Sequence, residues 1–191
     1  MNDNRQQNLR DAFVFALLVA IGVAGRWGQP EWCFTPTAAT AIFAGCYFRR
    51  LGIAALVPVS ILMISDFMLP AYNSFGVMVA TYAVMMVPVL FGRWLSTSTG
   101  KGQTTLRLAV CGLVPAILFW LGSNFAVWAF QSDYPGTLAG LARCYWMAVP
   151  FFRWMLAGDV FYLAVLFGCS ALAGLTVKQL QQQRLAYESA R

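Results

Sequence analysis

The sequence predicts an all-α integral membrane protein with six transmembrane helices. Of its 191 residues, 60% are hydrophobic and only 10% are charged, whereas a soluble domain carries about 25% charged residues. Long apolar runs follow one another from residue 12 to residue 177 with few polar gaps, and the strict alternation of a membrane β-barrel is absent. No segment is long and polar enough to form a second domain, so we expect a single transmembrane domain over residues 1–191.

The first span is expected over residues 11–27, after a short N-terminal tail of residues 1–10. The basic start and apolar run also fit a signal peptide cleaved near Ala24 or Gly25. We favour a retained span because alanine recurs at every fourth position, which places these side chains on one helical face. A face of small residues lets another helix approach closely in lipid, and that helix belongs either to the same chain or to a partner. The stripe consists of Ala12, Ala16, Ala20 and Ala24.

The other spans are expected at residues 34–48, 51–69, 75–95, 108–130 and from residue 153 or 154 to 177. Pro36 suits a first helical turn, and Pro88 predicts a kink inside its span. Residues 96–107 are expected to form a flexible loop, which lacks the GxxxxGK[ST] spacing of a phosphate-binding loop. Residues 137–152 form an aromatic segment expected to be interfacial or re-entrant, and residues 178–191 a polar tail.

Basic residues are distributed unevenly over the two sides that six spans define. Ten of the 13 Lys and Arg residues fall on the side of the two termini, and only Arg26, Arg143 and Arg153 fall on the other. Segments on the cytoplasmic side carry such an excess, so we expect both termini and the loop of residues 96–107 in the cytoplasm. The net charge of +6 follows from this bias, and we therefore expect no nucleic-acid partner.

Polar residues gather at the outer ends of these spans. Charges within a membrane usually face a partner, a water-filled cavity or a ligand, and the inner halves of the spans carry no comparable residues. This one-sided pattern indicates a solute site open to the outside, not a through-going channel. We expect a cavity bordered by Asp159 and Arg143 and roofed by residues 27–33, 70–74 and 131–136. The expected ligand-binding residues are Thr35, Asp66, Tyr72, Asn73, Asn124, Arg143, Arg153 and Asp159.

Other roles for these residues remain open. The two acids could form structural ion pairs, Asp159 with Arg143 and Asp66 with Arg153, or they could relay protons. Asn124 could form a hydrogen bond between helices.

Two of the five cysteines, Cys33 and Cys144, fall on the outer side, where they could form a disulfide or act as soft metal ligands. The chain has no histidine and no CxxC pair, so common zinc sites are not expected. We predict no metal and no cofactor.

Four segments carry a resemblance to a known group of proteins. They read FTPTAATAIFAG, LVPVSILMISDFML, SNFAVWAF and YPGTLAGLARCYWMAVPFFRWMLAGDVFY, within residues 34–168. They resemble a family of uncharacterised bacterial membrane proteins related to the substrate-binding (S) components of energy-coupling factor (ECF) vitamin transporters. Six short helices, a small-residue stripe on the first helix and an outer pocket are likewise similar to those components.

The resemblance implies a protein of the bacterial inner membrane that binds a vitamin or a metal ion from outside. It would dock through Ala16, Ala20 and Ala24 onto an energy-coupling membrane subunit driven by two ATPases, and topple to release its solute inside. No substrate signature carries over. The histidine-rich N-terminus of nickel and cobalt binders is absent, which favours a vitamin-like organic solute, and a cobalamin-type soft ligand would need Cys33 or Cys144.

The expected function is thus uptake of a vitamin-like small organic molecule that binds at the outer face. The chain has no nucleotide-binding motif of its own, so it would either use the ATPases of a partner or work alone by facilitated movement. One alternative is a small secondary transporter that uses Asp66 or Asp159 to carry protons. A membrane-embedded enzyme acting on lipids ranks below both, because the sequence shows no histidine and no Ser/Lys or Cys/His constellation. We therefore do not expect an enzyme.

Overall fold

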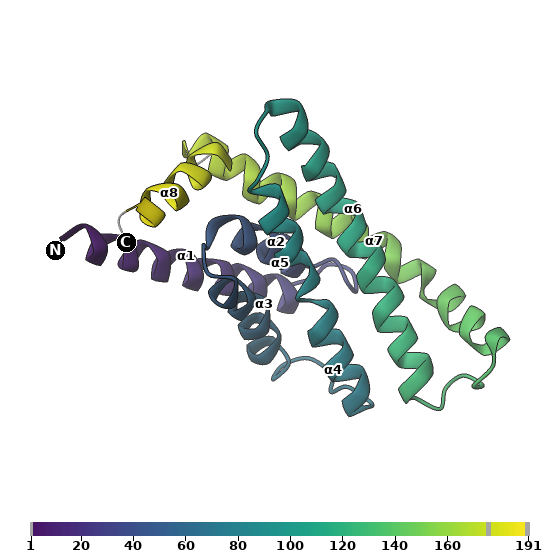
Figure 1. Cartoon of the computed structure of the whole chain (residues 1–191). Coiled ribbons are helices and arrows are strands. Elements are labelled where there is room, and N and C mark those ends of the chain that lie inside the picture. Colours follow the sequence, from purple (N-terminus) through teal and green to yellow (C-terminus); the bar gives the residue numbers. More distant parts are fainter. Residues whose placement is uncertain (1, 175–176, 190–191) are drawn as a thin grey trace.

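In the computed structural model, which describes residues 2–174 and 177–189, the chain is all-helical, as the sequence predicts (Figure 1). Within these residues there is no strand. The longest helices, α6 and α7, pack side by side. The helices are α1 (Asn2–Trp27), α2 (Thr37–Tyr47), α3 (Leu51–Ser65), α4 (Phe75–Val84), α5 (Val87–Leu95), α6 (Lys101–Phe130), α7 (Leu138–Leu172) and α8 (Val177–Ser189).

Helix α2 is the centre of the fold. All 11 of its residues are buried, and it packs against α1, α3, α5 and α7. Its side chains are mostly small, which lets neighbouring backbones approach closely. A Cβ atom added to Gly45 would collide with the carbonyl group of Val89, and one added to Gly92 would collide with that of Ile42. The α2–α5 contact is therefore made backbone to backbone, and both glycines are required for it.

In the part of the chain that the structure describes, four helical segments are long and apolar enough to cross a membrane: Arg5–Trp27, Phe75–Leu95, Gly102–Phe130 and Leu138–Leu172. Many large apolar side chains on the helices are exposed, as expected for a surface that faces lipid. The chain thus has the features of a helical membrane protein. Helices α2 and α3 are apolar but have only 11 and 15 residues, fewer than the roughly 20 of an ordinary span.

The segment Phe75–Leu95 is divided into α4 and α5 just before Pro88. Proline lacks an amide hydrogen and clashes with the preceding turn, which explains why the helix breaks there. The kink expected from the sequence is thus a break between two helices.

The expectation that residues 137–152 form a separate interfacial segment is wrong. They are the first half of α7, which continues for 35 residues. Thr137 caps its start by accepting a hydrogen bond from the amide of Gly140 at 3.1 Å, and the helix continues through Pro150. Its aromatic side chains pack on α6, where the ring of Trp120 lies 5.0 Å from that of Tyr145.

Two segments expected to be loop or tail are also helical. Helix α6 begins at Lys101, which shortens the expected flexible loop of residues 96–107 to residues 96–100. The side chain of Gln103 accepts a hydrogen bond from the amide of Thr99 at 2.8 Å and so supports this early start. The N-terminal tail belongs to α1 from Asn2 onward, and Val177–Ser189 of the expected C-terminal tail forms α8.

Candidate functional site

A cavity of about 500 Å³ lies where the ends of several helices meet. Its walls come from the end of α1, the start of α2, the end of α3, both α4 and α5, and the middle of α6 and α7. Ligand pockets typically measure about 300–1,000 Å³, so a small organic molecule would fit. We call this space the Asp159 cavity. The three loops expected to form its roof all contribute, through Gln29, Trp32, Cys33, Pro70, Ala71, Tyr72, Asn73 and Gln131.

Five of the eight expected site residues line the Asp159 cavity: Thr35, Asp66, Tyr72, Asn73 and Asp159. They come from three parts of the chain that are far apart in sequence. The structure brings them together because the connections before α2 and before α4 border the same cavity as the middle of α7, which carries Asp159.

The other three expected residues lie elsewhere. The side-chain amide of Asn124 donates a hydrogen bond to the carbonyl of Trp120 at 2.8 Å, within the same helix. Arg143 and Arg153 are exposed, and the guanidinium of Arg153 lies 5.4 Å from the centre of the Trp154 ring. The expectation that Arg143 and Asp159 border one cavity is wrong. They are 16 residues apart on one continuous helix, which corresponds to about 24 Å.

Asp66 forms an ion pair with Arg26, so the alternative in which it pairs with Arg153 is wrong. The Arg26 guanidinium lies 2.9 Å from Oδ1 of Asp66 and also donates to Ser65 Oγ at 2.6 Å. Oδ2 of Asp66 accepts from the hydroxyl of Tyr82 at 2.9 Å. Both carboxylate oxygens are thus satisfied, and the pair connects α1, α3 and α4. Sequence reasoning missed Arg26 as a site residue, although it is a solitary basic residue in the last turn of α1.

Asp159 differs from Asp66, because its carboxylate is buried and unpaired. The residue is only 5% exposed and lines the cavity. Across residues 2–174 and 177–189, neither oxygen has a hydrogen-bond or ion-pair partner. Neither oxygen is fully enclosed by protein atoms, so the carboxylate opens onto the cavity space.

The position of Asp159 is fixed by the residue before it. A Cβ atom added to Gly158 would lie 3.1 Å from the backbone of Phe34 and Thr35, so α7 packs directly on the backbone that leads into α2. The rings of Phe34 and Phe161, 5.8 Å apart, strengthen this contact. Asp159 is thereby held beneath the start of α2.

Cys33 lines the same cavity with an unusual backbone. Its φ of 74° lies in the left-handed region, which costs a residue other than glycine about 1–2 kcal/mol. Its amide donates to Oε1 of Gln29 at 3.0 Å, and its carbonyl accepts from the amide of Thr35 at 3.0 Å. Burial raises the pKa of the Cys33 thiol to about 11, with the charge of Asp159 adding to the effect and that of Arg26 opposing it. The thiol is therefore neutral at pH 7.

Neither a disulfide nor a metal centre is found among the described residues. Cys33 and Cys144 are free thiols, and Cys144 instead donates to the carbonyl of Asn124 at 3.4 Å. No three His, Cys, Asp or Glu side chains of that part of the chain gather closely enough to hold a metal ion. The alternative in which these two cysteines pair is thus wrong.

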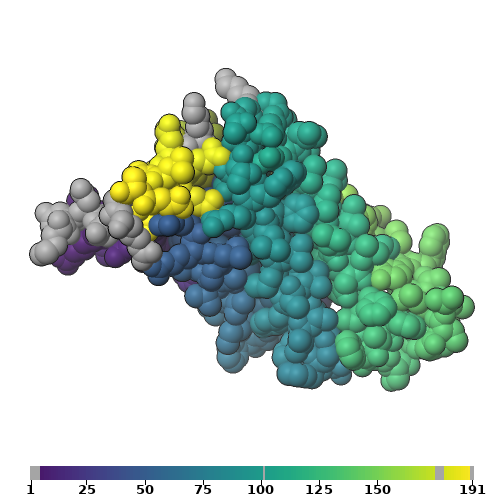
Figure 2. All heavy atoms as spheres, viewed as in Figure 1, coloured from purple at the N-terminus to yellow at the C-terminus, as the bar shows by residue number. Residues whose placement is uncertain are grey.

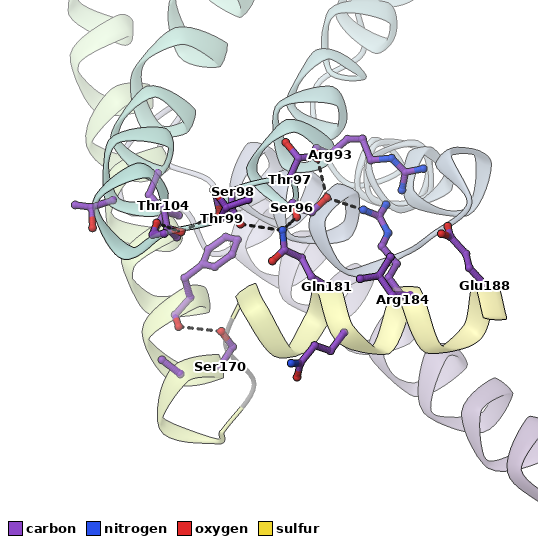
Figure 3. Close-up of a pocket in the computed structure, with 17 residues that line it drawn as sticks. Arg93, Ser96, Thr97, Ser98, Thr99, Thr104, Ser170, Gln181, Arg184 and Glu188 are labelled. Carbon is purple, nitrogen blue, oxygen red and sulfur yellow. Dashed lines mark hydrogen bonds between the residues drawn. The ribbon is translucent and has the colours of Figure 1, made fainter. Parts of the chain in front are cut away.

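A larger cavity, of about 1150 Å³, lies beside α8, and we call it the α8 cavity. Figure 2 shows α8 in yellow, seated against the blue region around residue 50 and the teal start of α6. In Figure 3, Gln181 and Arg184 point toward Ser96. Gln181 donates to the carbonyls of Ser96 and Ser98, and Arg184 donates to Ser96 Oγ and to the carbonyl of Phe48.

The charged groups that line the α8 cavity all have protein partners. Besides Arg184, these are Arg93, which donates to the carbonyl of Arg49 at 2.8 Å, and Glu188, which lies 3.0 Å from Arg49. Each of these groups is therefore held by the protein, and a single buried atom, Nε of Arg184, is left without a hydrogen-bond partner among the described residues. Although it is smaller, the Asp159 cavity is the better candidate for a binding site.

Comparison with known proteins places the chain by family alone. A family model described as "Family of unknown function (DUF6580)" matches residues 6–183. No curated protein matches the chain. No solved structure matches it either.

Proposed function

The chain belongs to the family of unknown function DUF6580, and we propose that it is a solute-binding component for membrane uptake of a vitamin-like small organic molecule. The observation that carries the proposal is the unpaired, buried carboxylate of Asp159 in a cavity of about 500 Å³. An isolated buried charge is costly, so a purely structural core would be expected to pair it. A bound solute supplies the missing partner.

The cavity is proposed to open to the outside of the bacterial inner membrane. Ten of the 13 basic residues lie at the opposite ends of the spans, which the positive-inside rule places in the cytoplasm together with both termini. Six crossings then arise from α1, α2, α3, the α4–α5 pair, α6 and α7. The two short crossings are tolerable because α2 is buried within the protein and contacts little lipid.

The small-residue stripe of α1 is proposed to bind an energy-coupling membrane subunit that works with ATPases. Ala16, Ala20 and Ala24 are exposed, so they do not serve packing within the described chain. Helix α1 instead packs through Gly22, which lies against Ile61, and through Gly25, which lies against Pro36. The free alanine face is thus available to a second helix, in keeping with the resemblance to S components.

A proton-coupled secondary transporter is the second candidate. The observation that favours it is again Asp159, since a buried carboxylate without a partner can bind and release a proton. The two candidates differ in whether solute uptake needs a partner. Uptake by the purified chain alone, driven by a pH gradient across proteoliposomes, would support the secondary transporter and contradict the need for ATPases.

The proposal is tested by mass spectrometry of small molecules that co-purify with the protein in lipid nanodiscs. We expect a defined organic solute in the wild-type protein and in Asp133→Asn, because Asp133 is an exposed loop acid. We expect the solute to be lost from Asp159→Asn. A cavity that holds no solute, whether after purification or after incubation with cell extract, would contradict the proposed function.

A further inference from the structure

We infer that the solute of the Asp159 cavity carries a cationic nitrogen, such as a protonated amine, and that Asp159 is its counter-ion. The inference rests on the proposed function and adds the chemical class of the substrate. Five ionisable side chains line the cavity: Arg26, Cys33, Asp66, Tyr72 and Asp159. Their charges, taken together, determine what the cavity attracts.

Only one charge in the cavity is uncompensated. Arg26 and Asp66 cancel each other in their 2.9 Å ion pair. The Cys33 thiol is neutral because its pKa is about 11, and burial also raises the pKa of the Tyr72 hydroxyl. Asp159 remains. A buried carboxylate without a partner takes up a proton, so a cation that binds beside Asp159 displaces this proton and pairs with the single negative charge that is left.

The start of α2 provides the main opposing influence. Helix α2 begins at Thr37, which lines the cavity, and a helix N-terminus acts like roughly half a positive charge. This is smaller than the full charge of a carboxylate, so the balance stays negative. A cation is thus favoured over an anion.

The surroundings of Asp159 suit an ammonium group attached to an apolar body. The N–H groups of an amine can satisfy both open oxygens through charge-assisted hydrogen bonds, which are stronger than neutral ones. The ring of Phe119 and the thioethers of Met85 and Met155 line the cavity and offer apolar contact for the rest of the molecule. Phe119 and Trp32 can also attract a cation through their π faces.

A matched pair of probes tests the inference, namely phenethylammonium and the neutral 2-phenylethanol, which are similar in shape. Binding is measured by isothermal titration calorimetry on the ligand-free protein in nanodiscs at pH 7. We expect the wild-type protein and Asp133→Asn to bind the cation at least about tenfold more tightly, equivalent to about 1.4 kcal/mol. Asp159→Asn should abolish this preference, and Asp159→Glu should restore part of it.

Loss of fold is separated from loss of the counter-ion by thermal unfolding of ligand-free protein. Asp159→Asn removes an unpaired buried charge, so its melting temperature should equal or exceed that of the wild type. A lower melting temperature would show that Asp159 serves the fold. The same measurement on Asp133→Asn should show no change.

Several outcomes would overturn the inference. The inference is wrong if the wild-type protein binds both probes equally or binds neither. It is also wrong if Asp159→Asn keeps the preference for the cation. A co-purifying solute that migrates as a neutral or anionic species in electrophoresis at pH 7 would also overturn it, while leaving the proposed uptake function in place. Absence of any solute from the wild-type protein contradicts the proposed function itself, so the two failures are distinguishable.

Discussion

The α8 cavity and the Asp159 cavity differ in how their polar groups are used. The α8 cavity has about 1150 Å³ and the Asp159 cavity about 500 Å³, so size favours the former. In the α8 cavity, however, Arg184, Arg93 and Glu188 are bound to other parts of the protein. In the Asp159 cavity one ion pair is complete and one carboxylate is free. A free buried charge is the better indicator of a ligand than volume is.

The same comparison explains what α8 does. Gln181 and Arg184 attach it to the ends of α2 and α5, and Leu180 is only 2% exposed, within the main core. The polar groups around the α8 cavity therefore hold a helix in place. The polar groups around the Asp159 cavity instead have two roles. Arg26 and Asp66 form an ion pair that holds helices together, which we call the brace, and Asp159 has no protein partner and is available to the solute.

The largest expected effect concerns the brace. Arg26→Gln leaves the partly buried Asp66 without its cation. Breaking a fully buried pair typically costs about 3–5 kcal/mol, and because the two side chains are 15% and 21% exposed, solvent screening lowers the expected cost to about 2–3 kcal/mol. We expect a loss of this size in the free energy of unfolding, measured with denaturant in detergent. Asp66→Asn combined with Arg26→Gln should recover part of it. Arg143→Gln, at an exposed position, is the control and should change stability by less than about 0.5 kcal/mol. An equal loss in Arg143→Gln and Arg26→Gln would contradict the stabilising role of the Arg26–Asp66 ion pair.

The second prediction concerns the reactivity of Cys33. Because the thiolate is the reactive form, a pKa raised from 9.0 to about 11 should slow alkylation at pH 7 by about a hundredfold, equivalent to about 2.7 kcal/mol. With Cys33 as the single cysteine, the maleimide reaction rate should rise about tenfold per pH unit from pH 7 to 10. A rate that levels off near pH 8 would show that Cys33 is not in the buried site described here.

Much of this arrangement could be predicted from the sequence. Composition gave the fold class, and the positions of Asp66 and Asp159 near the ends of apolar runs located the cavity at one end of the bundle. The side of a helix that a residue occupies was harder to predict. From the sequence, one segment is expected to end at residue 152 and the last span to begin after it, which puts Arg143 and Arg153 at the expected site. In the structure α7 is continuous, and both arginines lie on its exposed surface. The sequence carries no strong stop signal there, since Pro150 is accommodated inside the helix.

The partner of Asp66 was missed for a related reason. Arg26 was placed at the end of the first span and counted only as one of three basic residues on its side, whereas the packing of α1 on α3 brings it to Asp66. Long-range pairs of this kind depend on how three helices pack, and a single sequence contains no direct record of that packing. The resemblance to S components, by contrast, stays a prediction about function.

The third prediction weakens the attachment of α8. Arg184→Gln removes charged hydrogen bonds to Ser96 Oγ and to the carbonyl of Phe48, and we expect α8 to lose about 2 kcal/mol of local stability. Amide hydrogen exchange should accelerate in α8 alone. Solute binding in the Asp159 cavity should be unchanged, with Gln182→Ala, on the same helix, as the control. Loss of solute binding in Arg184→Gln would mean that the two cavities are coupled.

The fourth prediction concerns the position of Asp159. Gly158→Ala adds a methyl group 3.1 Å from the backbone of Phe34 and Thr35, so α7 must move away by a few tenths of an ångström. We expect a cost of about 1 kcal/mol in stability and a larger relative loss in solute affinity. Gly168→Ala, where a methyl group meets open space, is the matched control on the same helix. Equal effects from both variants would indicate that the contact at Gly158 does not position the carboxylate.

The smallest expected effect separates the backbone of Cys33 from its thiol. Cys33 adopts a φ of 74°, which glycine tolerates without the steric cost of about 1–2 kcal/mol paid by other residues. Glycine also gains freedom in the unfolded chain, worth about 0.5–1 kcal/mol, so Cys33→Gly should stabilise the protein by about 0–1.5 kcal/mol. Cys33→Val, whose branched side chain is poorly suited to this region, should destabilise it.

The unfolding free energies of the two Cys33 variants, measured in detergent, therefore decide whether the left-handed turn is needed for the cavity. A stable Cys33→Gly protein that still binds its solute would show that the turn, and not the thiol, is required. A stable Cys33→Gly protein that loses its solute would assign the thiol a direct contact. Destabilisation by glycine would contradict the left-handed backbone, and with it the shape of the loop that roofs Asp159.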